Sequence, residues 1–260
     1  MTFIFTTGDV DFSAGNVMGL AAAVGALVYQ NVQNIVTTIC VTIVMGILLM
    51  LCNYTLSVVL HIKSAMVAII GLTLYASITQ QIVGAGTLRI DYNLCRNLES
   101  GAFRYISFML FFGLCLLVYY WTPIGRQLRF IGGNVECARQ AGINITKARC
   151  IGFLLAGLGI GLAGVYQIIR TGSVSSSVAN GMGMDVMLAT VLGGMSIFGG
   201  AKSNAYSGFT GALTICALNQ GLLMVGVPST VIQGVRGVIF LLLVVLNSER
   251  AATLPSRQQF

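Results

Sequence analysis

Charged residues are scarce in this chain. Only 8% of its 260 residues are Asp, Glu, Lys or Arg, whereas 56% are hydrophobic and the mean hydropathy is +0.88. A soluble domain usually carries about 25% charged residues. Because so few charges cannot cover a surface that faces water, lipid must be the solvent for much of the chain. The composition excludes a separate soluble domain and predicts a single membrane domain over residues 1–260.

Motifs for metal, redox and nucleotide chemistry are also missing. The sequence has one histidine, His61, and its seven cysteines form no CxxC pair, so no metal or redox site is expected. No GxxxxGK[ST] pattern occurs, so the chain supplies no ATP site of its own. The GxGxxG pattern at 159–164 lies inside an apolar run, which favours helix packing through Gly157 and Gly161 over dinucleotide binding. We expect no catalytic residue and no cofactor bound by this chain.

The net charge of +7 would suggest a nucleic-acid partner if the chain were soluble. In a membrane protein, basic residues instead gather on cytoplasmic loops and set the orientation. We therefore expect a lipid bilayer around the chain and no nucleic acid. The 32 glycines sit largely within apolar runs, which is typical of transmembrane helices whose backbones approach closely.

Apolar runs long enough to cross a bilayer, which takes about 20 residues, occur roughly eight times. The predicted fold class is an all-α polytopic membrane protein with about eight transmembrane helices. The predicted spans lie near residues 16–31, 34–60, 64–84, 102–121, 150–170, 181–199, 205–225 and 229–247.

The loop 122–149 carries five basic residues and one acidic residue, so the positive-inside rule places it in the cytoplasm. Alternation then places Lys63, Lys202, Arg250 and Arg257 on the same side. The basic residues left outside are Arg89, Arg96, Arg104 and Arg170, which are partly offset by Asp91 and Glu99. This excess favours an orientation with the C-terminus in the cytoplasm.

The N-terminal residues form an apolar stretch too short to span a membrane, followed by Gly8, Asp9, Asp11 and Ser13. The stretch has no basic start and no cleavage pattern, so it is not predicted to be a signal peptide. It is typical of the end of a transmembrane helix whose beginning is missing. Asp11 or Ser13 can cap the helix that follows; alternatively, Asp11 can hydrogen-bond a polar solute at a helix break.

Two amides lie in apolar spans, Asn53 and Asn219. Buried amides commonly bridge helices, but in a transporter they also line a path for polar solutes. Both roles stay open. The candidate residues of a translocation path are therefore Asp11, Ser13, Asn53 and Asn219.

Residues 134–142 predict a short helix outside the bilayer. Asn134 is a good N-cap, and Gly142 stands where the end of a helix often needs a left-handed residue. Glu136 near the start and Arg139 near the end both suit the helix dipole. Because a helix of two turns is not stable alone in water, it must pack on something.

Small residues define one face of this helix, because Val135, Ala138 and Ala141 recur every third position. The residues alone leave two interpretations open. The helix either lies against the membrane face of its own chain or docks on another protein.

Four motifs, in order, resemble the permeases of ribose-type ABC sugar importers. The segments are GDVDFSAG at 8–15, GR at 125–126 with IGGNVECARQAGI at 131–143 and Lys147, VLGGMSIFGG at 191–200, and the helix from Gly211 to Val227. The chain is identified as a member of the branched-chain amino acid and sugar permease superfamily. The resemblance implies a type II-like ABC importer permease fold that lacks its N-terminal helix.

In that family a cytoplasmic loop carries a coupling helix, which docks in a cleft on the ATP-binding subunit. The resemblance implies that 122–149 is this coupling loop. The residues that it assigns to ATPase coupling are Gly132, Gly133, Asn134, Glu136, Ala138, Arg139, Ala141, Gly142 and Ile143. Small residues would suit such docking because they permit close approach. Within the later glycine motif, Gly193 and Gly194 are expected to pack between helices.

The resemblance also implies partners and a function. They are an ABC ATP-binding subunit that holds ATP and Mg²⁺, a second permease copy, and an extracellular or periplasmic sugar-binding protein. The expected function is import of a monosaccharide such as ribose, xylose or galactose across the bacterial cytoplasmic membrane. Met195 stands where the family usually has threonine, which leaves the identity of the sugar open.

Other substrates and another class of transporter are the alternatives. Permeases for branched-chain amino acids, nucleosides or autoinducer-like sugars share the fold. An ion-coupled secondary transporter would need a charged pair within the membrane, for which Asp185 and Arg236 are the candidates. A purely structural or signalling membrane protein would have no ATPase partner.

Overall fold

The computed structural model describes residues 1–84, 86–91, 98, 103–195, 199–200 and 203–252. Cys95, Arg96, Glu99, Lys202 and Arg257 lie outside the described residues. Almost all of the described chain is helical. Its elements are α1 (Thr2–Thr6), α2 (Ala14–Val32), α3 (Ile35–Val59), α4 (Ser64–Val83), β1 (Thr87–Arg89), α6 (Phe103–Trp121), α7 (Pro123–Gly133), α8 (Val135–Gln140), α9 (Ile145–Thr171), β2 (Ser173–Ser175), α10 (Met182–Leu192), α11 (Tyr206–Met224) and α12 (Ser229–Ala252).

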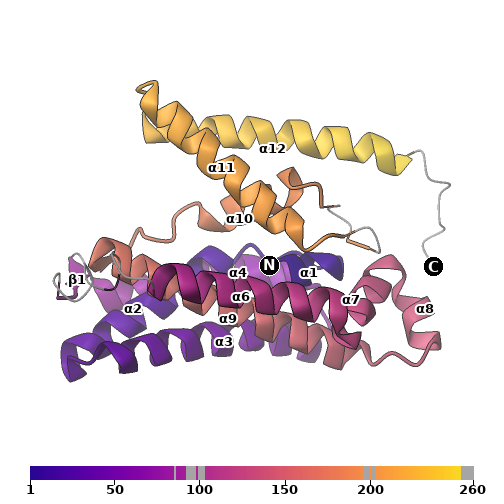
Figure 1. The fold of residues 1–260 in the computed structure, drawn as a ribbon, viewed down its shortest axis with the longest axis horizontal. Helices are drawn as coiled ribbons and strands as arrows, with labels where there is room; N and C mark the ends of the chain where they lie inside the picture. Colours follow the sequence, from indigo (N-terminus) through magenta and orange to yellow (C-terminus); the bar gives the residue numbers. More distant parts are fainter. Residues whose placement is uncertain (85, 92–97, 99–102, 196–198, 201–202, 253–260) are drawn as a thin grey trace.

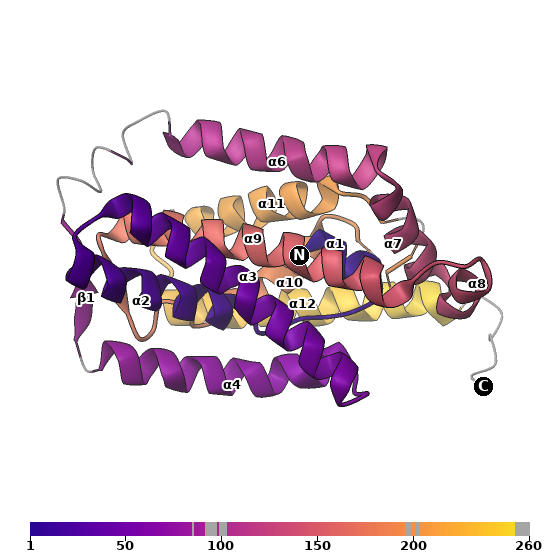
Figure 2. The same cartoon turned by 90° about the horizontal axis from the view of Figure 1, so that it is seen from below.

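The main body is a bundle in which α2 lies among α3, α4 and α9, with α6 along one side (Figure 1, Figure 2). Most residues of α2 are buried, and many of them are alanine or glycine. By contrast, α3, α4 and α6 leave large apolar side chains exposed. A soluble protein would not expose so many apolar side chains, so these faces indicate contact with lipid or with another membrane subunit.

Helices α11 and α12 form a second layer beside the bundle, and α10 lies between them and α2 (Figure 1). A tight backbone contact joins α10 to α11. A Cβ on Gly211 would lie 1.6 Å from the Ala189 carbonyl oxygen, and one on Gly193 would lie 1.8 Å from that of Ser207. Only glycine permits this approach. Gly194 differs from the expectation of helix packing: its φ of +89° and the open space around it show that it turns the chain after α10.

The two ends of the molecule are distinct. At one end, β1 pairs antiparallel with β2, with Thr87 opposite Ser175. At the other end lie α7 and α8, near the start of α4 and the end of α12 (Figure 2). Lys63 and the loop 122–149 therefore share one end, as the predicted alternation requires. No local sequence pattern predicts the pairing of β1 with β2, because the two strands lie far apart in the chain.

All eight predicted spans contain a helix, but the helices differ in reach. Four of those described are long and apolar enough to cross a membrane by length and composition: α3, α4, α6 and α9. The prediction of a full span at 181–199 is wrong. Helix α10 has 11 residues, about 16 Å at 1.5 Å per residue, against a hydrocarbon core of about 30 Å. The chain turns at Gly193 and Gly194 and leaves a half-helix.

The contact between α3 and α9 is the most extensive between any two described helices. A Cβ on Gly157 would lie 2.8 Å from Ile47 Cα, and one on Gly161 would lie 2.6 Å from Ile43 Cα. On the facing helix, a Cβ on Gly46 would lie 2.7 Å from Gly161 Cα. These approaches agree with the packing role expected from the GxxxG spacing.

Candidate coupling and translocation sites

Helix α7 was not predicted as a separate helix, yet it anchors the coupling loop. Pro123 stands in its first turn, where a missing N–H costs nothing. Gly125, Leu128 and Ile131, three residues apart, form its buried face. They pack with Phe3 of α1 and Tyr119 of α6. The proline followed by this apolar repeat was the signal that could have revealed the helix.

The end of α7 lies directly against α1. A Cβ on Gly132 would lie 1.8 Å from the Thr6 carbonyl oxygen, so only glycine fits there. Nothing lies within 4 Å of the corresponding atom on Gly133, the next residue. The two glycines that the sequence assigned to coupling therefore differ: Gly132 serves internal packing, whereas Gly133 faces open space.

Helix α8 begins as the sequence predicts and is shorter than the expected 134–142. The Asn134 side chain accepts hydrogen bonds from the backbone N–H of Glu136 at 2.9 Å and of Cys137 at 3.1 Å. The last helical residue is Gln140, and Gly142 follows with a left-handed φ of +76°. Both ends are thus defined by local chemistry, which is why the sequence located them.

Two of the three small residues, Val135 and Ala138, point into the chain rather than toward a docking partner, whereas Ala141 is exposed. Ala138 is fully buried in the cluster formed by α6, α7 and α9, and Val135 packs against the same cluster. The expectation that Ala138 would contact the ATPase is corrected, because its side chain has no outward surface. Within 133–142, the exposed residues are Gly133, Glu136, Cys137, Arg139, Gln140, Ala141 and Gly142.

A short connection leads from α8 to α9. The Ile143 N–H donates to the Ala138 carbonyl at 3.1 Å, and the Ile143 side chain packs against the buried cluster. Asn144 caps α9 by accepting from the Lys147 N–H at 3.1 Å. The Ile143 bond ties the connection to α8, and the Asn144 bond ties the next residue to α9. A displacement of α8 would therefore be passed to the start of α9.

One turn further along α9, Arg149 forms an ion pair with Asp9 of the α1–α2 loop, with Nε 3.3 Å from Oδ2. The two groups are within ion-pairing distance but lack the alignment of a hydrogen bond. Burial raises the pKa of the Asp9 carboxyl, and the charge of Arg149 opposes that shift. Both residues line a cavity of about 280 Å³, together with Tyr54 and His61.

Three of the four predicted path residues lie together. Asp11 Oδ1 accepts from the Ser13 hydroxyl at 2.6 Å, and Ser13 Oγ accepts from Asn53 Nδ2 at 2.8 Å. The Tyr75 hydroxyl donates to Asn53 Oδ1 at 2.6 Å. This network joins the α1–α2 loop to α3 and α4, and Tyr75 is the member that the sequence reading missed.

The network is closed from solvent in this conformation. Asp11 and Asn53 are 2% exposed and Ser13 is fully buried, while Asp11 Oδ2 has no hydrogen-bond partner. Neither Asp11 nor Ser13 caps α2 through its side chain. Instead, the Asp11 carboxylate accepts from the Ser13 N–H and turns the chain into the helix. Their role in a path stays a prediction.

Asn219 lies elsewhere, on α11, where its Oδ1 accepts from Arg236 Nε at 2.9 Å. Arg236 also donates through Nη1 to Asp185 Oδ2 at 2.5 Å. The arginine within the last span is thus paired with a carboxylate and an amide, as a charge in a membrane requires. These three residues tie α10, α11 and α12 together.

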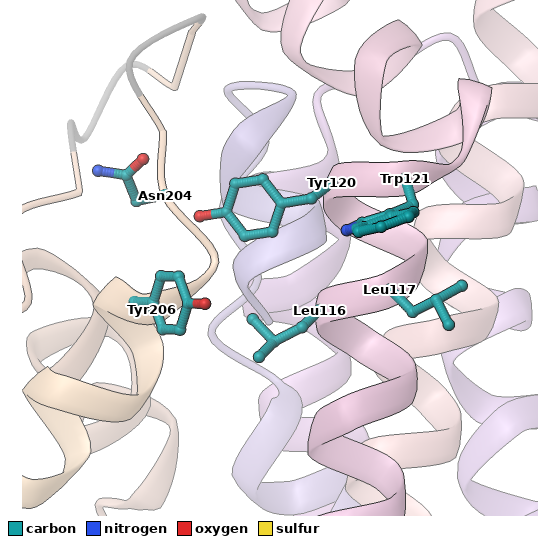
Figure 3. Close-up of a pocket in the computed structure, with 6 residues that line it drawn as sticks. All are labelled: Leu116, Leu117, Tyr120, Trp121, Asn204 and Tyr206. Carbon is teal, nitrogen blue, oxygen red and sulfur yellow. The ribbon is translucent and has the colours of Figure 1, made fainter.

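Aromatic residues surround a cavity of about 700 Å³ between the end of α6 and the start of α11. Figure 3 shows the Tyr120 hydroxyl directed across the gap toward Asn204 and Tyr206, while Trp121 lies against the α6 ribbon, farther from Tyr206. Trp121 is 85% exposed. Exposed Trp and Tyr at a helix end are typical of the membrane–water interface, so this end of α6 marks the boundary of the bilayer on the side of α7.

Comparison with known families shows which family of membrane proteins the chain belongs to. The family described as "Branched-chain amino acid transport system / permease component" matches residues 1–245. The chain belongs to this family. The permease is therefore a multi-pass protein of the cytoplasmic (inner) membrane, and the membership expected from the four motifs is confirmed.

Curated relatives cover nearly the whole permease. The galactofuranose transporter permease protein of Escherichia coli K12 is 27% identical over 98% of this chain and 76% of its own length. The ribose import permease protein of Bacillus subtilis is 29% identical over 97% of this chain and 80% of its own length. The xylose transport system permease protein of E. coli K12 is 37% identical over 49% of this chain and 32% of its own length. No solved structure matches the permease.

Proposed function

We propose that the permease is the membrane subunit of an ATP-driven ABC importer that moves a monosaccharide into the cell. The observation that carries this proposal is the series of relatives, whose names specify galactofuranose, ribose, galactose and xylose. The short capped helix α8, at the same end as the basic loops, supports the ATP-driven part. Its exposed polar face is unlike the lipid-facing surface of the spans.

Each partner has a place on the molecule. An ABC ATP-binding subunit docks on the exposed residues of α8 and holds ATP and Mg²⁺, because the chain has no P-loop of its own. A sugar-binding protein delivers solute at the opposite end, where β1 and β2 lie. A second permease copy packs against the exposed apolar helix faces and completes the path. The permease performs no covalent chemistry.

The mechanism follows from the contacts around α8. Val135 and Ala138 of α8 pack against α7 and α9, so movement of a docked ATPase moves these helices together with α8. The ion pair between Arg149 and Asp9 passes this movement to the α1–α2 loop. That loop holds Asp11 and Ser13, which bond Asn53 on α3. Shifting these helices opens the path to alternate sides.

The test is sugar uptake by the complex reconstituted in proteoliposomes with its ATP-binding subunit and its sugar-binding protein. We expect uptake of labelled ribose, xylose or galactose that requires ATP and resists an ionophore. Uptake of leucine or valine instead would support the branched-chain substrates that the family description names. Uptake that an ionophore abolishes at constant ATP would contradict the proposal and favour an ion-coupled transporter.

A further inference from the structure

A cavity with mainly apolar walls and a few polar groups lies between α10 and α12. Its volume is about 330 Å³, at the lower end of the range for small-molecule sites. The lining residues are Gly181, Met184, Asp185, Leu188, Gln233, Arg236, Gly237 and Phe240. Two charged side chains, one amide and one aromatic ring therefore face a space of the size that a small solute needs.

The charged residues of this cavity are held in place by hydrogen bonds but remain partly exposed. The side chains of Arg236 and Asp185 are 21% and 28% exposed. Arg236 donates through Nε to Asn219 and through Nη1 to Asp185, and these two bonds fix the plane of its guanidinium group. A guanidinium offers five N–H donors, and a carboxylate has two oxygens. The pair therefore keeps unused hydrogen-bonding capacity beside the cavity.

We infer that this cavity is a binding subsite for a neutral polyhydroxylated solute. Hydroxyl groups both donate and accept, so they can bond Asp185 and Arg236 at once, and charge-assisted bonds of this kind are strong. The Phe240 ring and Leu188 supply an apolar wall for the carbon face of such a solute. Charge neutrality of the pair disfavours ions and suits a sugar. The inference rests on the proposed function and names side chains of α10 and α12 that would hold the sugar.

The glycines of α12 permit a matched test by cavity filling. Gly237 lines the cavity, whereas Gly234, one turn earlier, does not. No atom lies within 4 Å of a Cβ built on either residue. Gly237→Leu therefore adds an apolar side chain at the cavity lining, where the backbone has room for a Cβ, and Gly234→Leu makes the same change outside the lining.

We expect Gly237→Leu to lower ATP-dependent sugar uptake by about tenfold in the reconstituted complex, through a higher KM, because it removes solute contacts worth about one factor of ten in affinity. ATP hydrolysis stimulated by the sugar-binding protein stays, and Gly234→Leu leaves both quantities unchanged. Unchanged uptake with Gly237→Leu, or an equal loss with both variants, would overturn the subsite. Restoration of uptake by the double variant Asp185→Arg with Arg236→Asp would also overturn the subsite. That exchange keeps an ion pair between α10 and α12 but reverses the groups that would bond the solute, so restored uptake would show a purely structural role for the pair.

A binding measurement separates this inference from the proposed function. A cysteine introduced by Gln233→Cys lies on the cavity and reacts with a membrane-impermeant maleimide, measured against the unmodified chain as background. We expect ribose, xylose or galactose to slow this reaction and leucine to leave it unchanged. If the unmodified chain imports no sugar but protection is seen, the proposed transport fails and the subsite stands. If no sugar protects the cysteine, the subsite is wrong whatever the transport result.

Discussion

At the scale of single residues, the molecule buries a polar network in an apolar bundle. Asp11, Ser13, Asn53 and Tyr75 lie on three separate segments and bond one another in a chain. Hydrogen bonds between membrane helices contribute about 0.6 kcal/mol on average. Loss of one partner costs more, because it leaves a buried donor or acceptor without a bond. The network therefore sets where the α1–α2 loop lies against α3 and α4.

Asn53→Ala tests the network. It leaves the hydroxyls of Ser13 and Tyr75 without their shared partner, so we expect a loss of about 1–3 kcal/mol in unfolding free energy. Thermal or denaturant unfolding in detergent measures it. Asn31→Ala is the control, because Asn31 is exposed and bonds only the Leu27 carbonyl of its own helix. Equal stability of the two variants would contradict the network's role.

The sequence identified the residues of this network better than their pairing. Asn53 was a candidate because an amide in an apolar run needs a partner. The identity of that partner could not be predicted, because Ser13 lies 40 positions away in the chain. Asn219 looked equivalent, yet it bonds Arg236 in the other layer. Which amide meets which partner depends on helix packing, and no local pattern carries that information.

At the scale of elements, the proposed coupling depends on the connection between α8 and α9. The caps on Asn134 and Asn144 and the left-handed Gly142 were predictable, because each is a local rule of helix ends. The direction of the small-residue face was not. A repeat of small residues every third position suits close approach to any surface, and here that surface is α7 and α9 of the same chain.

Arg149→Ala tests the link from α9 to the α1–α2 loop. It leaves the Asp9 carboxylate half-enclosed and unpaired, so we expect a loss of about 1–3 kcal/mol in unfolding free energy and reduced sugar uptake per ATP hydrolysed. Unfolding in detergent and the ratio of uptake to hydrolysis are the measurements. For the unfolding measurement, Arg139→Ala is the control, because its pair with Glu136 is exposed and is worth less than about 1 kcal/mol. A ratio unchanged by Arg149→Ala would show that this ion pair transmits nothing.

Gly161→Ala tests the contact between α3 and α9. Its new Cβ would lie 2.6 Å from Ile43 Cα, so the helices must separate. We expect a loss of about 1–3 kcal/mol in unfolding free energy, as for other overpacked cores. Gly221→Ala in α11 is the matched control, because it meets no atom within 4 Å and gains helix propensity. Destabilisation of both variants to the same degree would show that close approach at Gly161 is not the cause.

Most spans were predictable because lipid imposes long apolar runs. Helix α10 was not, since the apolar run continues past its end while Gly193 and Gly194 turn the backbone. Helix α7 was missed for the opposite reason: it is amphipathic and lies in a polar loop. Hydropathy thus locates segments in lipid but says little about breaks within them or about helices outside it.

At the scale of the whole molecule, α8 and the paired strands β1 and β2 lie at opposite ends of the permease, and α10, which lines the proposed subsite, lies between these ends (Figure 1). Helices α7 and α8 are at one end, and the paired strands β1 and β2 are at the other (Figure 2). Between them, α3 and α9 run the length of the bundle in close contact. In the proposed mechanism, an ATPase docked on α8 therefore acts on solute farther along the bundle through movement of these helices.

The most direct test of the account is capture of the cognate ATP-binding subunit by the permease in co-purification. The chosen substitutions are Gly133→Asp with Ala141→Glu, because both positions face outward and leave the fold intact. The control is Ser176→Glu with Ser177→Asp, which adds the same charge at exposed positions directly after β2. The account predicts that the first pair releases the ATP-binding subunit and the control retains it. Capture by the first pair as strong as by the unmodified permease would show that α8 is not the docking surface.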